Sequence, residues 1–120
     1  LAVSTTHDVL EDVTLYLKRS KTAVGRIVPL TIHPQPGPTA VERGDGLHAL
    51  QLAQDLSLRI RARSPQERAR PLHLFAAAPN ALLFFLGQLA RSFGEVQLYE
   101  HDFGSGKPGA YVRSLRLPVG

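Results

Sequence analysis

The sequence of 120 residues contains no cysteine, no methionine and no tryptophan. Without cysteine it forms no disulfide, carries no thiolate nucleophile and offers no cysteine-ligated zinc site. No apolar run approaches the roughly 18 residues that a membrane-spanning helix needs, so we expect no membrane contact. The chain begins with Leu1, and no basic segment followed by an apolar one indicates a signal peptide. We therefore expect a fragment of a longer polypeptide.

Several familiar site motifs are also missing. No Gly-x-Gly-x-x-Gly follows a predicted strand, which excludes a dinucleotide-binding fingerprint. The segment Gly104-Ser105-Gly106-Lys107 differs from a phosphate-binding P-loop, because His101 and Pro108 stand where that motif needs glycine and serine or threonine. The histidines show no paired spacing that would indicate a metal site. They are His7, His33, His48, His73 and His101.

The sequence also lacks a motif for a catalytic nucleophile. Gly104-Ser105-Gly106 lacks the spacing of the Gly-x-Ser-x-Gly elbow. The segment Tyr99-Glu100-His101-Asp102 gathers titratable groups at the end of a predicted strand, but alternating exposed residues of an edge strand give the same pattern. We expect no catalytic site and no cofactor, so the chemistry to look for is binding.

The composition is that of one globular domain, with 43% apolar and 20% charged residues over residues 1–120. The net charge of +4 suits an anionic partner. Much of the positive charge is concentrated in one stretch that holds Arg59, Arg61, Arg63, Arg68 and Arg70. This stretch fits a solvated helix end, where basic side chains complement the helix dipole. The alternative is a patch that contacts phosphates or a partner.

Hydrophobic periodicity predicts alternating strands and helices. Strands are expected over Leu1–Thr5, Val24–Ile32, Leu72–Ala77, Val96–Phe103 and Tyr111–Leu117, with Pro29 indicating an edge position for the second. Helices are expected from His7 to about Lys21, over Leu47–Arg63 with Asp45 as N-cap, and over Asn80–Ser92 with Gly94 as C′ residue. Ser64-Pro65 is expected to stop the second helix. This order predicts an α/β domain with a mainly parallel sheet flanked by helices.

The third predicted helix is apolar on nearly every side. Leu82, Phe85, Leu86, Leu89 and Phe93 form one stripe, while Leu83, Phe84 and Ala90 add apolar surface elsewhere. A helix that is apolar all round is buried all round. We therefore expect the segment Leu82–Phe93 to contact either the rest of a longer chain or another subunit.

Two turns carry the binding hypothesis. The first, Thr5-Thr6-His7-Asp8, follows the first strand, and the second, Ala77-Ala78-Pro79-Asn80, follows the third strand. Each combines polar or small residues with a helix N-terminus, where the helix dipole favours an anion. Plain helix capping by Thr5 or Thr6 and an ordinary strand-to-helix connection at Pro79 are the alternatives. Because both turns follow parallel strands, we expect them at one edge of the sheet.

Four spaced segments resemble the C-terminal half of SAVED domains. These are Ser4-Thr5-Thr6-His7-Asp8-Val9, Asp45-Gly46 with His48-Ala49, Leu72-His73-Leu74-Phe75-Ala76-Ala77-Ala78-Pro79, and Val96-Gln97-Leu98-Tyr99-Glu100. The resemblance implies a Rossmann-like, CARF-like three-layer half-domain, of which a full SAVED domain has two. It implies a cytoplasmic bacterial sensor of cyclic oligonucleotides, of the cyclic tri- or tetra-adenylate type, in CRISPR or CBASS anti-phage signalling.

In such families the sensor controls a linked effector, so any catalytic activity is expected in a separate domain or chain. The first hypothesis is therefore a sensor that holds phosphates at the two helix N-termini, with His7 and Asn80 contacting base or ribose edges. The second is a degenerate sensor fold that acts as an interaction or assembly surface. A ring nuclease is a more distant third, with His7 and its neighbours as the available groups.

Overall fold

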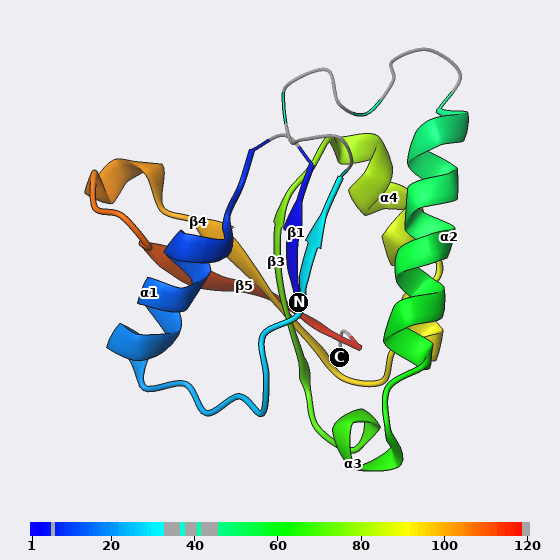
Figure 1. The fold of residues 1–120 in the computed structure, drawn as a ribbon, viewed down its shortest axis with the longest axis horizontal. Helices are drawn as coiled ribbons and strands as arrows, with labels where there is room; N and C mark the ends of the chain where they lie inside the picture. The colour runs from blue at the N-terminus through cyan, green and yellow to red at the C-terminus, as the bar shows by residue number, and fades with distance from the viewer. Residues whose placement is uncertain (6, 33–36, 38–40, 42–45, 119–120) are drawn as a thin grey trace.

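A five-stranded sheet forms the centre of the computed structural model, which describes residues 1–5, 7–32, 37, 41 and 46–118 (Figure 1). The helices are α1 (Leu10–Ser20), α2 (Leu47–Arg61), α3 (Pro65–Arg68) and α4 (Asn80–Gln88). The strands are β1 (Ala2–Ser4), β2 (Pro29–Thr31), β3 (Leu72–Ala77), β4 (Val96–His101) and β5 (Tyr111–Leu117). Two short 3₁₀ turns, η1 (Ala90–Ser92) and η2 (Phe103–Ser105), flank β4.

The strands lie in the order β2-β1-β3-β4-β5. β1 to β4 are mutually parallel, whereas β5 runs antiparallel to β4. Helical connections return the chain for each parallel pair, while the turn after β4 is short enough for an antiparallel one. Because β2 lies on one side of β1 and β3 lies on the other, the strand order reverses between β1 and β3. In open α/β sheets a ligand crevice lies beyond the carboxyl ends of the strands at such a reversal.

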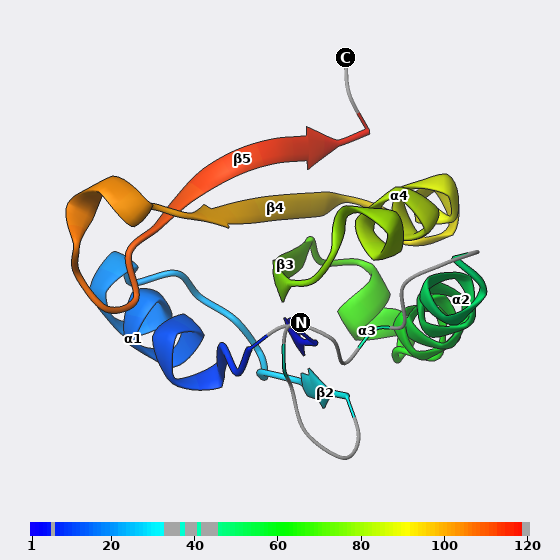
Figure 2. The ribbon, with the colours of Figure 1, turned by 90° about the horizontal axis from the view of Figure 1, so that it is seen from above.

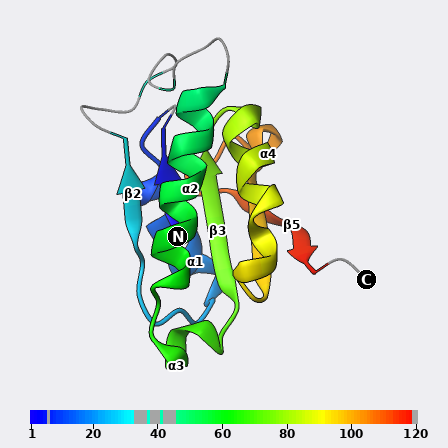
Figure 3. The ribbon, with the colours of Figure 1, turned by 90° about the vertical axis from the view of Figure 1, so that its right-hand side faces the viewer.

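Helices lie on both faces of this sheet. Figure 2 shows α1 on one side and α2 with α4 on the other, and Figure 3 shows α2 and α4 in front of β3. The predicted α/β class with a mainly parallel sheet is therefore confirmed. The finer assignment as a Rossmann-like, three-layer, CARF-like domain stays a prediction.

Strand β3 separates two hydrophobic cores. Leu72 and Leu74 pack with α2 and α4, whereas Phe75 and Ala77 pack with α1. A strand that is covered on both faces reads as a continuous apolar run. This is why the segment was predictable as a buried strand.

An aromatic cluster joins α1 to the sheet. The rings of Phe75 and Tyr99, on neighbouring strands, stack with centroids 4.2 Å apart. Tyr16 of α1 meets both rings edge-on, with centroids at 5.7 Å and 5.4 Å. Such pairs contribute about 0.5–1.5 kcal/mol each beyond the area they bury. The cluster therefore fixes the position of α1 over β3 and β4.

Helix α4 is buried on one side only. Leu82 and Leu86 are buried against the core that includes α2, but Leu83 is 36% exposed and Phe84 is 62% exposed. Burial all round, which the composition of this helix predicts, is therefore wrong for this chain. The additional apolar surface at Leu83 and Phe84 is confirmed, and the contact that would cover it stays a prediction.

Two predicted segments need corrected boundaries. The strand expected over 24–32 is reduced to β2, because Pro29 and Thr31 lie exposed at the sheet edge and only β1 pairs with this segment. The helix expected over 80–92 ends at Gln88 and continues as η1. There the Arg63 guanidinium donates to the carbonyl of Phe93 at 2.7 Å, which supports the end of this segment.

Helix α2 starts at Leu47 as predicted, whereas the short helix α3 was not predicted. Asp45 lies outside the described residues, and Gly46, with φ at +78°, is the residue that precedes α2. Ser64-Pro65 starts the short helix α3 as well as stopping α2, because the Ser64 hydroxyl accepts from the Glu67 N–H at 3.2 Å. Proline is favoured at this first helical position because its missing N–H needs no partner there.

Gly109 marks the closest approach between the turn after β4 and helix α1. Its φ is +68°, and a Cβ placed on it would lie 2.9 Å from both the Asp12 carbonyl oxygen and the Leu15 Cβ. We expect Gly109→Ala to lower the free energy of unfolding by about 3 kcal/mol, since it adds a clash with backbone to the strain of a left-handed residue. Urea unfolding measures this loss.

Gly106 provides the matched control, because its φ is +64° and an added Cβ meets nothing within 4 Å. Gly106→Ala should therefore cost about 1 kcal/mol, the conformational part alone. Equal losses at the two positions would contradict the close approach at Gly109.

Candidate functional site

The two predicted turns lie side by side at the carboxyl edge of the sheet. Ser4 of β1 is the register partner of Ala77 of β3. The next residue, Thr5, donates both its backbone N–H, at 3.0 Å, and its hydroxyl, at 2.8 Å, to the Ala77 carbonyl. Thr5 is 4% exposed. Its hydroxyl therefore holds the two turns together, and its proton is already donated to the Ala77 carbonyl.

Polar side chains in and next to the first turn already accept hydrogen bonds from nearby backbone N–H groups. The Asp8 carboxylate accepts from the Leu10 N–H at 3.0 Å, and the Ser4 hydroxyl accepts from the Val9 N–H at 3.1 Å. Asp8 and Ser4 therefore cap the start of α1, whereas the Thr5 hydroxyl, a predicted cap, bonds to Ala77 instead. Thr6 itself lies outside the described residues. His7 is exposed beside this turn.

The second turn leaves backbone donors available. Pro79 is extended, with φ −66° and ψ 154°, and its carbonyl accepts from the N–H groups of Leu82 and Leu83. No side chain caps α4. The N–H groups of Asn80 and Ala81 make no hydrogen bond to the described residues. This helix N-terminus therefore presents free donors and a positive dipole end.

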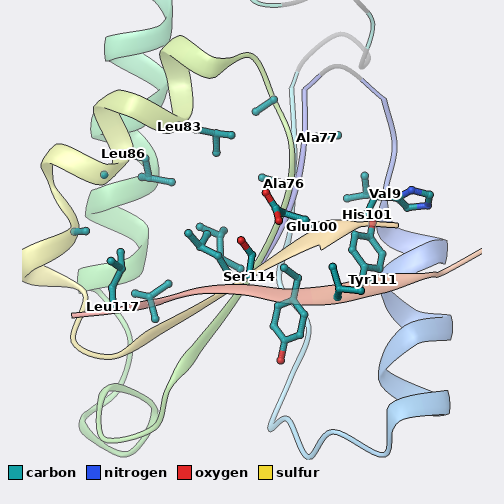
Figure 4. A pocket seen from close by; sticks show the side chains of 18 of the residues that line it. Val9, Ala76, Ala77, Leu83, Leu86, Glu100, His101, Tyr111, Ser114 and Leu117 are labelled. Atoms are coloured by element: carbon teal, nitrogen blue, oxygen red, sulfur yellow. The ribbon is translucent and has the colours of Figure 1, made fainter. Parts of the chain in front are cut away.

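A split between β3 and β4 opens a cavity next to this turn. The two strands pair only as far as Phe75 and Tyr99. Beyond that point β3 stays paired with β1 through Ala77, while β4 stays paired with β5 through His101. The cavity has a volume of about 790 Å³ and is bounded by α4, β3, β4 and β5 (Figure 4).

Only part of the predicted site lines this cavity. His7, Ala77 and Ala78 are lining residues, whereas the other described members of the predicted set lie outside the lining. Those others are Thr5, Asp8, Pro79 and Asn80. The structure therefore brings the two turns together, as expected, but adds a wall from β4 and β5 that the turns did not predict.

The lining is mainly apolar with a polar mouth. Leucines from three elements, Leu74, Leu86 and Leu98, form much of its wall. Glu100 and Asp102 lie at the carboxyl end of β4. Ligand pockets commonly have this combination of an apolar body and a few polar groups, at volumes of about 300–1,000 Å³.

An irregularity in the β4–β5 pairing shapes the cavity floor. The register shifts between Gln97 and Tyr99, so that Val96 lies opposite Leu117 and Glu100 lies opposite Val112. A bulge re-aims side chains in this way. As a result Leu117 lines the cavity, and Arg116 instead forms an ion pair with Glu95.

The titratable segment at the end of β4 lines the cavity from Tyr99 to Asp102. The Tyr99 ring also belongs to the core beside α1, and its hydroxyl lies 2.9 Å from His73 Nδ1. Burial, followed by the Tyr16 charge, raises the pKa of Tyr99, and burial lowers the pKa of His73. The Asp102 carboxylate accepts from the Gly104 N–H. These groups do not converge on one reacting atom.

Tyr111 and His101 complete this aromatic region. Burial, with a smaller contribution from the Asp12 charge, raises the pKa of Tyr111 to about 12. The His101 ring packs at 4.6 Å from the Phe103 ring. Its Nδ1 is buried without a hydrogen-bond partner among the described residues. Both side chains line the cavity.

The arginine-rich stretch lies at the other end of the sheet. Figure 1 places α3 and the end of α2 opposite the start of α4. Arg26 pairs there with Glu67 at 2.8 Å, and Arg59 pairs with Asp55 at 3.3 Å. The surplus positive charge of the chain therefore does not surround the predicted anion site.

Sequence reasoning considered Glu100 only as a catalytic group and missed its place in the cavity. A period of two places Val96, Leu98 and Glu100 on one face of β4, and this signal was available in the sequence. The contribution of Ser114 and Leu117 to the lining depends on the bulge, and no local sequence pattern predicts that bulge.

Among the described residues, no helix is long and apolar enough to cross a membrane, and no group of three histidine or acidic side chains is placed to hold a metal ion.

Comparison with known proteins identifies the family of this chain. CD-NTase-associated protein 4 of Enterobacter hormaechei subsp. hoffmannii (strain UCI 50) is 32% identical over 118 residues. The matched part covers 98% of this chain and 23% of that relative, so the chain spans about a quarter of its length. Residues 1–117 match the model of the family described as SAVED, the SMODS-associated and fused to various effectors sensor domain. The chain therefore belongs to the SAVED family of sensor domains.

Proposed function

We propose that this chain is a sensor module that binds a cyclic oligonucleotide of the tri- or tetra-adenylate type in anti-phage signalling. Binding would control a linked effector, which would supply any catalytic activity. The chain would contribute one CARF-like half of the sensor. Membership of a family of sensor domains and the relation to a CD-NTase-associated protein support this proposal.

The observation that carries the proposal is the pair of hydrogen bonds from Thr5 to Ala77. They hold both turns beside a cavity of about 790 Å³ and join β1 to β3, the two strands between which the strand order reverses. The turns thus form one wall of one site. Sites of this kind are where open α/β sheets bind nucleotides.

The free N–H groups at the start of α4 are suited to a phosphate of the ligand. They lie at the positive end of the helix dipole, and Ala78 just before them leaves space for a close approach. The carboxylates of Asp8 and Glu100 would repel a phosphate. In this arrangement phosphates lie towards Asn80, and bases or sugars lie towards His7 and β4.

A second candidate is an interaction module, and the exposed side of α4 favours it. Phe84 is 62% exposed, and its ring lies 5.7 Å from that of Phe85. An exposed phenylalanine in a patch with Leu83 is typical of a surface that contacts a protein. This surface would serve the remainder of a SAVED domain, another subunit or an effector.

The phosphate position is tested by Asn80→Asp, a change of nearly equal size. A carboxylate at the start of α4 stabilises the helix but repels a phosphate there, so fold and binding respond in opposite directions. We expect at least tenfold weaker binding, about 1.4 kcal/mol, with an unchanged or higher melting temperature. Calorimetry with cyclic di-, tri- and tetranucleotides measures the affinity.

Gln88→Glu is the matched control, because it adds the same charge at the far end of the same helix. Its affinity for the ligand should equal that of the parent chain. The measurement is made on this chain and on a longer polypeptide that contains it. Absence of binding to every ring in both would overturn the sensor proposal.

The interaction surface is tested by Phe84→Asp. If α4 packs on a partner, this charge in the apolar contact should shift the elution volume in size exclusion toward the smaller species. Gln88→Asp, which changes an exposed residue of the same helix, should leave the elution volume unchanged. An unaltered elution profile for Phe84→Asp, in the longer polypeptide as well, would contradict the assembly role.

A further inference from the structure

Glu100 ends an otherwise apolar face of β4. Val96 and Leu98 lie on the same face and contribute to the cavity wall. Figure 4 shows Glu100 among the lining side chains, and in that view it lies between Ala76 and Ser114. A charged residue that continues an apolar row into a cavity is a polar group placed at its mouth.

The Glu100 carboxylate is exposed and has no partner among the described residues. Glu11 and Glu100 are the two described carboxylates without a hydrogen bond or ion pair. Partners are found for Asp8, Asp12, Asp55, Glu67, Glu95 and Asp102. Glu11 lies on α1 outside the cavity lining, so Glu100 is the unpartnered carboxylate of the described residues that lines the cavity.

An ionised carboxylate accepts hydrogen bonds and donates none. It therefore repels a phosphate and attracts an N–H or O–H donor. Leu98, on the same face of β4, and Leu83 of α4 line the same cavity, and this apolar lining suits the face of a nucleobase more than the polar rim of a sugar. The amino groups of adenine and cytosine are donors on the edges of such bases, whereas the corresponding atoms of hypoxanthine and uracil are acceptors.

We propose that Glu100 is a specificity-determining residue that accepts a hydrogen bond from the amino group of a nucleobase inserted between α4 and β4. This inference rests on the proposed binding of a cyclic oligonucleotide. It divides the ligand between two walls of the site. The α4 N-terminus holds a phosphate, and Glu100 selects the base.

The test compares cyclic trinucleotides of equal ring size whose bases are adenine or hypoxanthine. The parent chain should bind the adenine ring at least tenfold more tightly, because the hypoxanthine oxygen faces the carboxylate. In Glu100→Gln the side-chain amide both donates and accepts, so the preference should fall below about threefold. Calorimetry on this chain and on a longer polypeptide that contains it gives both affinities.

Glu11→Gln is the matched control, since it removes the same charge from an unpartnered carboxylate outside the cavity. It should retain the full preference for adenine. An unchanged preference in Glu100→Gln, or an equal loss of affinity for both rings, would overturn base selection by Glu100 while leaving ligand binding intact. If neither trinucleotide binds to the parent chain or to the variants, and the cyclic di- and tetranucleotides do not bind either, the proposed function is overturned instead.

Discussion

Strand β3 pairs with β1 through Ala77 but with β4 only as far as Phe75, and the rest of the site depends on this mismatch. The double hydrogen bond from Thr5 to Ala77 holds the end of β3 against β1. The antiparallel pairing with β5 draws the end of β4 away in the other direction. The cavity opens between the two ends, directly beside the turn that starts α4.

The distribution of charge gives this site a particular character. Arginines gather around α3 and the end of α2, while Glu100 and Asp102 line the cavity at the end of β4. In the binding mode proposed above, backbone N–H groups and the α4 dipole supply the attraction for a phosphate. The uncharged parts of the ligand then lie towards β4.

Most of the fold was predictable because its local signals agree with its tertiary contacts. β3 is a mainly apolar run, β4 begins with alternating apolar and polar residues, and α1 and α2 show helical periodicity with charged ends. The errors occur where contacts with another element determine the length of a strand or the end of a helix. The length of β2 is set by its single pairing partner, and the end of α4 is set by contacts such as the one from Arg63 to Phe93. Ser4 and Asp8, and not Thr5, cap α1, because the Thr5 hydroxyl donates its hydrogen bond to β3.

The sequence by itself determined the α/β class, the parallel order of the strands and the two turns at one edge of the sheet, because periodicity and turn chemistry are local properties. It also carried the resemblance to SAVED domains, which the family match confirms. The tertiary structure alone decided which turn residues line a cavity and which form hydrogen bonds that hold the strands together. It also decided that a register shift brings Leu117 to the cavity and that Glu100 is left without a partner. These features depend on pairing between strands far apart in the chain, and no local pattern encodes that pairing.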